Sequence, residues 1–115
     1  MHEMSIVMSV IDTVEKERHK QQADTVESVE LDIGVLSGVE MDAFYFAWKA
    51  GVKETLLEKT ALKVNRPEAR AICPVCGNRF TAESRFDGCP VCENPFCETV
   101  SGNELKIKRI VFIKN

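Results

Sequence analysis

Five cysteines, all between positions 73 and 97, are the feature that most restricts the structures open to this 115-residue chain. Four of them form a repeated motif, Cys73-Pro-Val-Cys76 and Cys89-Pro-Val-Cys92, and twelve residues separate the two copies. Two residues between thiolates let both sulfur atoms face one ion, and two such turns supply a tetrahedral four-thiolate site. Zn(II) favours this donor set, and iron is the other ion that fits it. The expected ligands of one zinc ion are Cys73, Cys76, Cys89 and Cys92.

Alternative roles for the cysteines fit less well. Their odd number argues against a disulfide framework, and the N-terminus lacks the basic region of a secretory signal, so the cytoplasm is the expected compartment. A thioredoxin-like redox pair needs a helix after its motif, and helical spacing follows neither copy. A rubredoxin-like iron site stays open as an alternative, which the colour of the protein would decide. Cys97 is expected to be a free or lightly buried thiol, and it is also a fifth candidate ligand.

The closed donor set indicates a structural role for the metal. Four cysteines saturate a tetrahedral ion and leave no open position for hydrolytic chemistry. The block offers few core residues, namely Phe80, Phe86 and Phe96, so metal binding is expected to drive its folding. No nucleophile–base pair or phosphate-binding loop stands elsewhere in the sequence, and we do not expect an enzyme.

Outside the cysteine block, the spacing of apolar residues predicts the fold. Helical spacing begins at Ile6 and again at Met41, and it predicts helices that end near positions 20 and 57. Alternation of apolar and polar residues predicts strands over 28–35, 62–65 and 104–113. The expected fold class is α/β (α+β): two helices on one face of a small mixed sheet of about three strands, with an inserted zinc-ribbon subdomain.

The same pattern predicts two domains. An α/β domain comprises residues 1–69 and 101–115, and a zinc-binding subdomain comprises residues 70–100. The run Ile110–Ile113 is apolar on both faces and is expected to be central or covered. The aromatic residues of the second helix are expected in the core, except that Phe46 lies off the main stripe and is available to a partner.

The distribution of charge limits the class of partner. The net charge is −3; residues 1–65 carry 7 Lys and Arg against 12 Asp and Glu, and residues 66–115 carry 8 against 6. Nucleic-acid binding normally needs a strong basic surplus on one face, so it is a weak expectation here. It is still the runner-up function, as a zinc-ribbon module that binds nucleic acid or a transcription partner. Its support is Lys106, Lys108, Arg109, Lys114, Arg79 and Arg85. No apolar run approaches the roughly 20 residues that span a bilayer.

The amino terminus offers a second candidate metal site. The chain opens Met1-His2-Glu3. A free α-amine, the amide nitrogen of His2 and its imidazole can close fused chelate rings around one cation. Ni(II) and Cu(II) favour such planar nitrogen donor sets. Glu3 adds a carboxylate beside the same point, although a single histidine near a terminus is more often only a solvated side chain.

The whole chain resembles one known family. The resemblance rests on the Met1-His2-Glu3 start, the loop Leu31-Asp32-Ile33-Gly34-Val35-Leu36-Ser37-Gly38-Val39-Glu40, the run Phe44–Trp48, the paired C-P-V-C motifs and the closing strand. Together these features resemble the HypA/HybF hydrogenase-maturation nickel metallochaperones. The start and the loop are the most specific of them, because a zinc ribbon alone occurs in many families.

The resemblance implies a function and a set of residues. Members of this family bind Ni(II) through the N-terminal histidine, here His2, with Glu3 and a loop carboxylate that matches Glu40. Nickel would then lie in the α/β domain, with the Met1 amine as a further donor, and the cysteine block would hold structural zinc. The implied partners are a HypB-type GTPase and the large subunit of [NiFe]-hydrogenase, with urease accessory proteins for some relatives. This chain departs from the family pattern at Glu93, where glycine is common, and at the additional Cys97.

Overall fold

The computed structural model describes residues 2–84 and 86–115, and the described chain forms two compact units. We call the first the helical unit; it contains the residues up to Leu31, with Gly38–Val64 and Ile107–Asn115. The second, the cysteine unit, contains Asp32–Ser37 and Asn65–Lys106. The cysteine unit is thus larger than the predicted subdomain 70–100, because it also contains segments before and after those residues. The division into domains made from the sequence stays a prediction.

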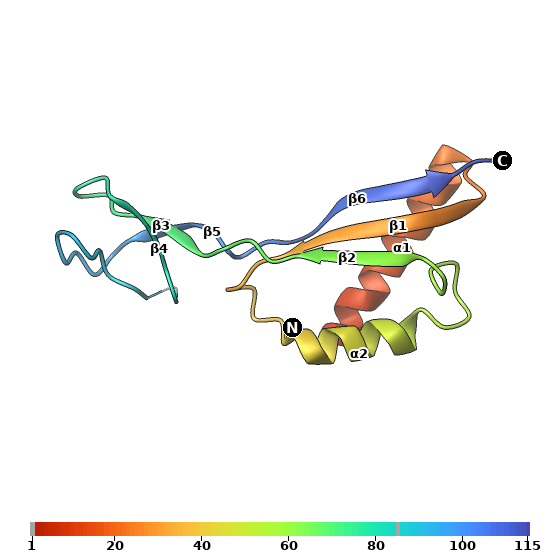
Figure 1. The fold of residues 1–115 in the computed structure, drawn as a ribbon, viewed down its shortest axis with the longest axis horizontal. Coiled ribbons are helices and arrows are strands. Elements are labelled where there is room, and N and C mark those ends of the chain that lie inside the picture. Colours follow the sequence, from red (N-terminus) through yellow and green to blue (C-terminus); the bar gives the residue numbers. More distant parts are fainter. Residues whose placement is uncertain (1, 85) are drawn as a thin grey trace. The chain divides into compact units, whose positions relative to one another are not determined.

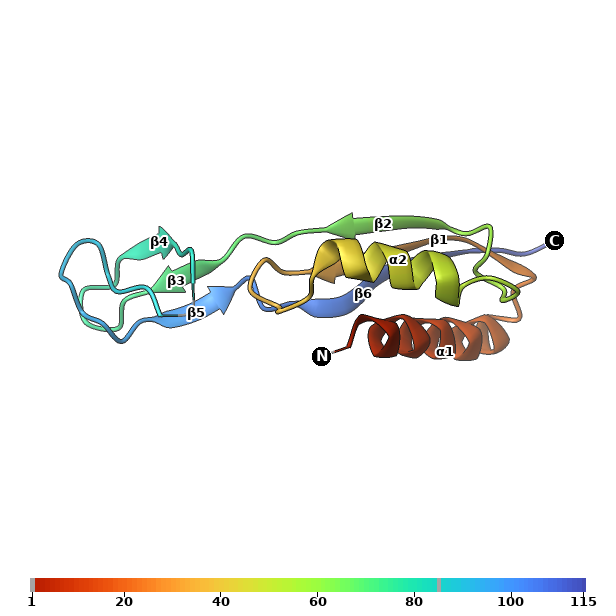
Figure 2. The same cartoon turned by 90° about the horizontal axis from the view of Figure 1, so that it is seen from below.

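The helical unit is a three-stranded sheet with two helices. Along the chain it consists of α1 (Glu3–Gln21), β1 (Thr25–Ile33), α2 (Met41–Gly51), β2 (Ala61–Asn65) and β6 (Leu105–Ile113). The strand order is β2-β1-β6. Strands β1 and β2 run in the same direction and are joined through α2, whereas β6 runs the opposite way, which makes the sheet mixed (Figure 1). Figure 2 shows α1 and α2 side by side, each beginning at the same end of the unit. The predicted fold class is confirmed.

The core of this unit follows the predicted periodicities. Helix α1 buries Ile6, Val7, Val10 and Val14, one face of a 3.6-residue repeat. Strand β1 buries Val29, Leu31 and Ile33 on alternate positions. In α2, Phe44 is completely buried and packs against Trp48, with ring centroids 6.3 Å apart. Phe46 is 77% exposed, in agreement with its position off the apolar stripe. Tyr45 is 48% exposed, so the expectation that it lies in the core is wrong.

Three features of the helical unit differ from the prediction. Strand β1 spans Thr25–Ile33 and not 28–35. Helix α2 ends at Gly51 and not near 57, because the backbone turns and Glu54 takes a positive φ of 62°. The apolar spacing continued beyond the helix because Val52 and Leu57 are buried even though they lie in turns. The run Ile110–Ile113 was expected to be central or covered. It is not central, because β6 is an edge strand and β1 is central, but residues 110–112 are half-buried.

The cysteine unit has a small sheet of its own. Strands β3 (Arg70–Ile72), β4 (Arg79–Thr81) and β5 (Glu98–Ser101) pair antiparallel in the order β4-β3-β5. Their buried cluster consists of Ala69, Ala71 and Ala82, with Leu36, Phe80 and Cys97 packed against it. Phe86 and Phe96, two of the three expected core residues, are 89% and 81% exposed. This unit therefore has very little apolar core.

The backbone of the segment 32–37 lies close to the backbone of residues 102–104 in the cysteine unit. The N–H of Gly34 donates to the carbonyl of Glu104 at 2.8 Å, and the N–H of Leu36 donates to the carbonyl of Gly102 at 2.7 Å. A Cβ atom at position 34 would lie 2.1 Å from the Gly102 carbonyl oxygen. Only glycine fits this position.

Candidate metal centres

The four motif cysteines converge on one point. Their sulfur atoms all lie within 4.8 Å of one another, with 3.5 Å between Cys73 and Cys92 and 3.6 Å between Cys76 and Cys89. A tetrahedral zinc with Zn–S bonds of about 2.3 Å requires sulfur–sulfur distances of about 3.8 Å. Among residues 2–84 and 86–115, this is the one group of three or more His, Cys, Asp or Glu side chains whose ligand atoms converge in this way. The donor set fits zinc.

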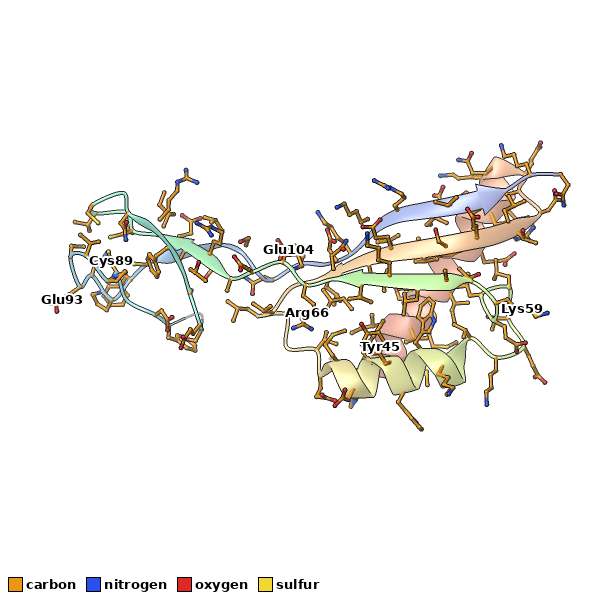
Figure 3. All side chains as sticks on the ribbon, in the orientation of Figure 1. Tyr45, Lys59, Arg66, Cys89, Glu93 and Glu104 are labelled. Atoms are coloured by element: carbon orange, nitrogen blue, oxygen red, sulfur yellow. The ribbon has the colours of Figure 1, made fainter. Side chains whose placement is uncertain are left out.

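Both copies of the motif fold into the same turn, the second of which runs between the labelled residues Cys89 and Glu93 in Figure 3. In the first turn, the N–H of Gly77 donates to the carbonyl of Cys73 at 2.8 Å. In the second turn, the N–H of Glu93 donates to the carbonyl of Cys89 at 3.0 Å. Gly77 has a φ of 76° and Glu93 a φ of 63°, so both occupy the left-handed region. The departure from the family pattern at Glu93 therefore leaves the turn intact but places a residue with a Cβ where glycine is favoured.

Two asparagines outside the predicted ligand set connect the two turns. The carbonyls of Asn78 and Asn94 each accept the N–H of the first cysteine in their own turn at 2.9 Å. Each side-chain amide donates across the site, Asn94 to the sulfur of Cys73 at 3.6 Å and Asn78 to that of Cys89 at 3.9 Å. Sequence reasoning missed both, although the repeat extends two residues further, as C-P-V-C-x-N. Such outer contacts orient metal ligands.

The electrostatics of the site call for a cation. The backbone N–H of Cys76 lowers the pKa of Cys73 to about 6, with help from the Asn94 amide, and the N–H of Cys92 lowers the pKa of Cys89. The N–H of Asn94 favours the Cys92 thiolate, but the adjacent Cys73 sulfur and burial outweigh it and raise the pKa of Cys92 to about 12. Four sulfur atoms this close cannot all ionise without a positive charge among them. A divalent ion supplies that charge and releases the remaining protons.

Substitutions at the two left-handed positions should change zinc affinity in opposite directions. No atom lies within 4 Å of a Cβ built at Gly77, so Gly77→Ala adds only the conformational penalty of about 1 kcal/mol. Its zinc affinity should fall about fivefold, whereas Glu93→Gly should raise it by a similar factor. Competition with a chromophoric chelator measures both. Equal affinities for both variants and the parent would show that the turns do not limit binding.

Cys97 lies beside this site. It is half-buried, and its sulfur donates to the carbonyl of Asn94 at 3.5 Å. Burial raises the pKa of its thiol, and the neighbouring Cys73 thiol raises it further. Cys97 also lines a shallow pocket of about 380 Å³ together with Pro74, Phe86, Pro95, Phe96 and Glu98.

The predicted nickel residues occupy the beginnings of the two helices. His2 is the N-cap of α1, with an extended backbone, and its carbonyl accepts the N–H groups of Ser5 and Ile6. Its imidazole is exposed and does not cap the helix within the described part of the chain. Glu3 is half-buried in the first turn of α1. Met1 lies outside the described residues.

Glu40 is the N-cap of α2, and this geometry brings it next to Glu3. One Glu3 carboxylate oxygen accepts the backbone N–H of Glu40 at 3.4 Å. The Glu40 carboxylate itself accepts the N–H of Asp42 at 3.2 Å and that of Ala43 at 2.7 Å. The side chain therefore caps its own helix, and each oxygen keeps a further lone pair for another partner.

Two basic residues of the last strand lie close to an acidic side chain. Lys108 and Arg109 each lie 3.9 Å from the Glu30 carboxylate, and Lys63 lies 4.0 Å from it. Glu30 is largely buried beneath these three side chains, at 13% exposure. The runner-up function, nucleic-acid binding, is therefore not favoured. Arg85, which was also named in its support, lies outside the described residues. Neither helix in the described chain has the length and apolar character to cross a membrane.

Known proteins are similar to this chain over nearly its whole length. The family model "Hydrogenase/urease nickel incorporation, metallochaperone, hypA" matches residues 1–112. The hydrogenase maturation factor HypA of Prosthecochloris aestuarii is 40% identical over 110 residues, which cover 96% of this chain and 97% of that protein. The protein of the same name from Geobacter metallireducens is 41% identical over the same coverage.

Solved structures show the same fold. The solution structure of the Ni metallochaperone HypA from Helicobacter pylori covers 100% of both chains, with 25% identity and a TM-score of 0.71. A family match over nearly the whole sequence, relatives at about 40% identity and a common fold lead to one conclusion. This chain belongs to the HypA family of hydrogenase and urease nickel-incorporation metallochaperones.

Proposed function

We propose that this protein is a nickel metallochaperone that binds Ni(II) at its N-terminus and delivers it for the maturation of [NiFe]-hydrogenase. The match of residues 1–112 to the nickel-incorporation family carries the proposal. The geometry supports it, because the four-cysteine site is closed and suits a resident zinc, whereas the donors at the start of α1 are exposed. A cargo ion needs the second kind of site, since it must leave by ligand exchange.

The proposed nickel donors are the amine of Met1, the amide nitrogen and imidazole of His2, and the carboxylates of Glu3 and Glu40. Because His2 is the N-cap of α1, its N–H takes no part in the hydrogen bonds within the helix. Deprotonating it for Ni(II) breaks no helical hydrogen bond. Glu3 already contacts the beginning of α2, which places both carboxylates at one end of the helical unit.

The delivery role suggests the partners. We propose a HypB-type GTPase and the large subunit of [NiFe]-hydrogenase, with urease accessory proteins as further partners in keeping with the family description. The proposed compartment is the cytoplasm, where thiols are kept reduced and able to bind zinc. The protein is proposed to act as a carrier and not as an enzyme, since neither metal centre offers a catalytic arrangement.

Calorimetric nickel titration tests the proposal. The untagged protein should bind one Ni(II), and a version with one extra residue before Met1 should lose that binding while it keeps one zinc. His2→Ala should weaken nickel binding by roughly 100-fold or more, because even the loss of an outer hydrogen-bond partner costs metal sites 10–100-fold. His19→Ala is the matched control, since His19 is the only other histidine and is exposed on the same helix. Undiminished binding by the extended protein would contradict the amine-and-amide chelate.

A second set of variants separates the two roles of Glu40. Glu40→Asn keeps a good helix cap but removes the negative carboxylate. Glu40→Ala removes both the carboxylate and the cap, and should also cost about 1 kcal/mol of stability. If Glu40 is a ligand, both variants should weaken nickel binding equally, whereas only Glu40→Ala should lower the melting temperature. Weakened binding in Glu40→Ala alone would assign Glu40 to the cap.

A further inference from the structure

We propose that Cys97 is a reserve ligand of the zinc site, which takes the place of Cys92 so that the metal keeps four thiolates while the second turn opens. This inference concerns the cysteine unit alone and goes beyond the proposed nickel function. It would stand if nickel bound elsewhere, because it rests on the contacts around Cys73 and Asn94.

The sulfur of Cys97 is already next to the site. Burial and the neighbouring Cys73 thiol raise the pKa of the Cys97 thiol, and the Cys73 sulfur itself lies 3.5 Å from the Cys92 sulfur. Asn94 holds this arrangement together. Its carbonyl accepts the Cys97 thiol at 3.5 Å and its side-chain amide donates to the Cys73 sulfur at 3.6 Å. Asn94 therefore connects a fifth thiol to the edge of the sulfur tetrahedron that Cys73 and Cys92 form.

Cys92 is the ligand best suited to leave. Cys73 and Cys89 are buried, whereas Cys92 is exposed. The residue after it, Glu93, holds a left-handed φ of 63° that is unfavourable for a residue with a Cβ. Releasing Cys92 would relieve this conformation. Cys76 is also exposed, but it belongs to the first turn, where Gly77 adopts the left-handed region without that penalty.

The exchange conserves charge and needs no oxidant. The bond between zinc and the Cys92 sulfur breaks, and a bond between zinc and the Cys97 sulfur forms. The proton of the Cys97 thiol passes to the departing Cys92 thiolate, so the site holds one zinc and four thiolates before and after. Cys97 would leave the pocket that it lines with Phe86 and Phe96, so the exchange would reshape the exposed apolar surface of this unit.

Cobalt substitution tests the proposal, since the intensity of the cobalt–thiolate bands reports how many sulfur ligands are bound. Cys92→Ser should keep one metal ion and a four-thiolate spectrum. The double variant Cys92→Ser with Cys97→Ser should lose the fourth thiolate, and its affinity should fall by roughly tenfold or more. Cys97→Ser alone should match the parent. Identical spectra and affinities for the single and double variants would overturn the proposal.

Two further measurements keep the test decisive. Cys73→Ser should not be rescued by Cys97, because Cys73 is completely buried and belongs to the first turn; a four-thiolate spectrum in that variant would show a general spare thiol and overturn the specific exchange. The second uses the folded parent protein. After alkylation of Cys92 by iodoacetamide, native mass spectrometry should still find one zinc, whereas the alkylated Cys97→Ser protein should have lost it. Equal zinc loss from both would also reject the proposal.

Discussion

Removing the zinc should unfold the cysteine unit and leave both helices folded. The buried apolar cluster of this unit consists of three alanines, and each buried methyl-sized group contributes only about 0.8 kcal/mol. Structural zinc in small domains binds with an apparent free energy of about 10–16 kcal/mol at neutral pH. The metal therefore dominates the stability of the unit. The helical unit has its own core around Phe44, Val7 and Val29, which are completely buried.

The aromatic residues allow the two units to be followed separately. The only tryptophan and the only tyrosine, Trp48 and Tyr45, both belong to α2 in the helical unit. After a strong chelator removes zinc, Trp48 fluorescence and the helical circular-dichroism signal should be nearly unchanged. Amide exchange in 70–101 should rise to the rate of an unfolded chain. Loss of the helical signal together with the zinc would show that the helices depend on the metal.

Replacing Gly34 by alanine should destabilise the cysteine unit by about 3 kcal/mol or more, since a methyl group forced into a packed site costs 1–3 kcal/mol even when side chains can move aside. Here the atoms that it meets are the backbone oxygen and carbon of Gly102, at 2.1 Å and 2.3 Å. The hydrogen bonds from Gly34 and Leu36 to that segment would have to break or shift. A loss of this size is a large share of the 5–15 kcal/mol of a typical domain.

Val35→Ala is the matched control for this substitution. Val35 is the next residue along the chain and is 45% exposed, so its truncation should cost well under 1 kcal/mol. Scanning calorimetry of the zinc-loaded proteins should show a clearly lower transition for Gly34→Ala only. Faster amide exchange at Leu36 would locate the change. Equal transitions in both variants would mean that the backbone around Gly102 adjusts easily.

Local patterns in the sequence were enough to predict the larger elements. The repeat from Ile6 to Val14 indicated α1, and the alternation from Val29 to Ile33 indicated the central strand, because burial on one side imposes these periods. Strands β3, β4 and β5 were not predicted, since three or four residues are too few for a period to be visible. The end of α2 was missed because Leu57 is buried in a turn at a position that also fits the helical spacing.

The two candidate centres differ in how far the sequence could specify them. The zinc ligands follow from the spacing of two short turns, each of which is a local structure. The contact between Glu3 and Glu40 joins residues 37 positions apart, so only the packing of two helices reveals it. Similarly, the use of the Glu40 carboxylate as a helix cap depends on where α2 begins. The nickel ligand set stays a prediction for this reason.

The chain crosses between its two units four times, after Leu31, Ser37, Val64 and Lys106. One strand of the first sheet, β6, is consequently translated after the whole cysteine segment. On the ribosome, α1, β1, α2 and β2 are complete while one edge of β1 still lacks its neighbour. The exposed edge can be closed only after residues 66–104 have been synthesised. Because such distant pairing slows folding, zinc supply during synthesis should influence how long that edge stays open to other chains.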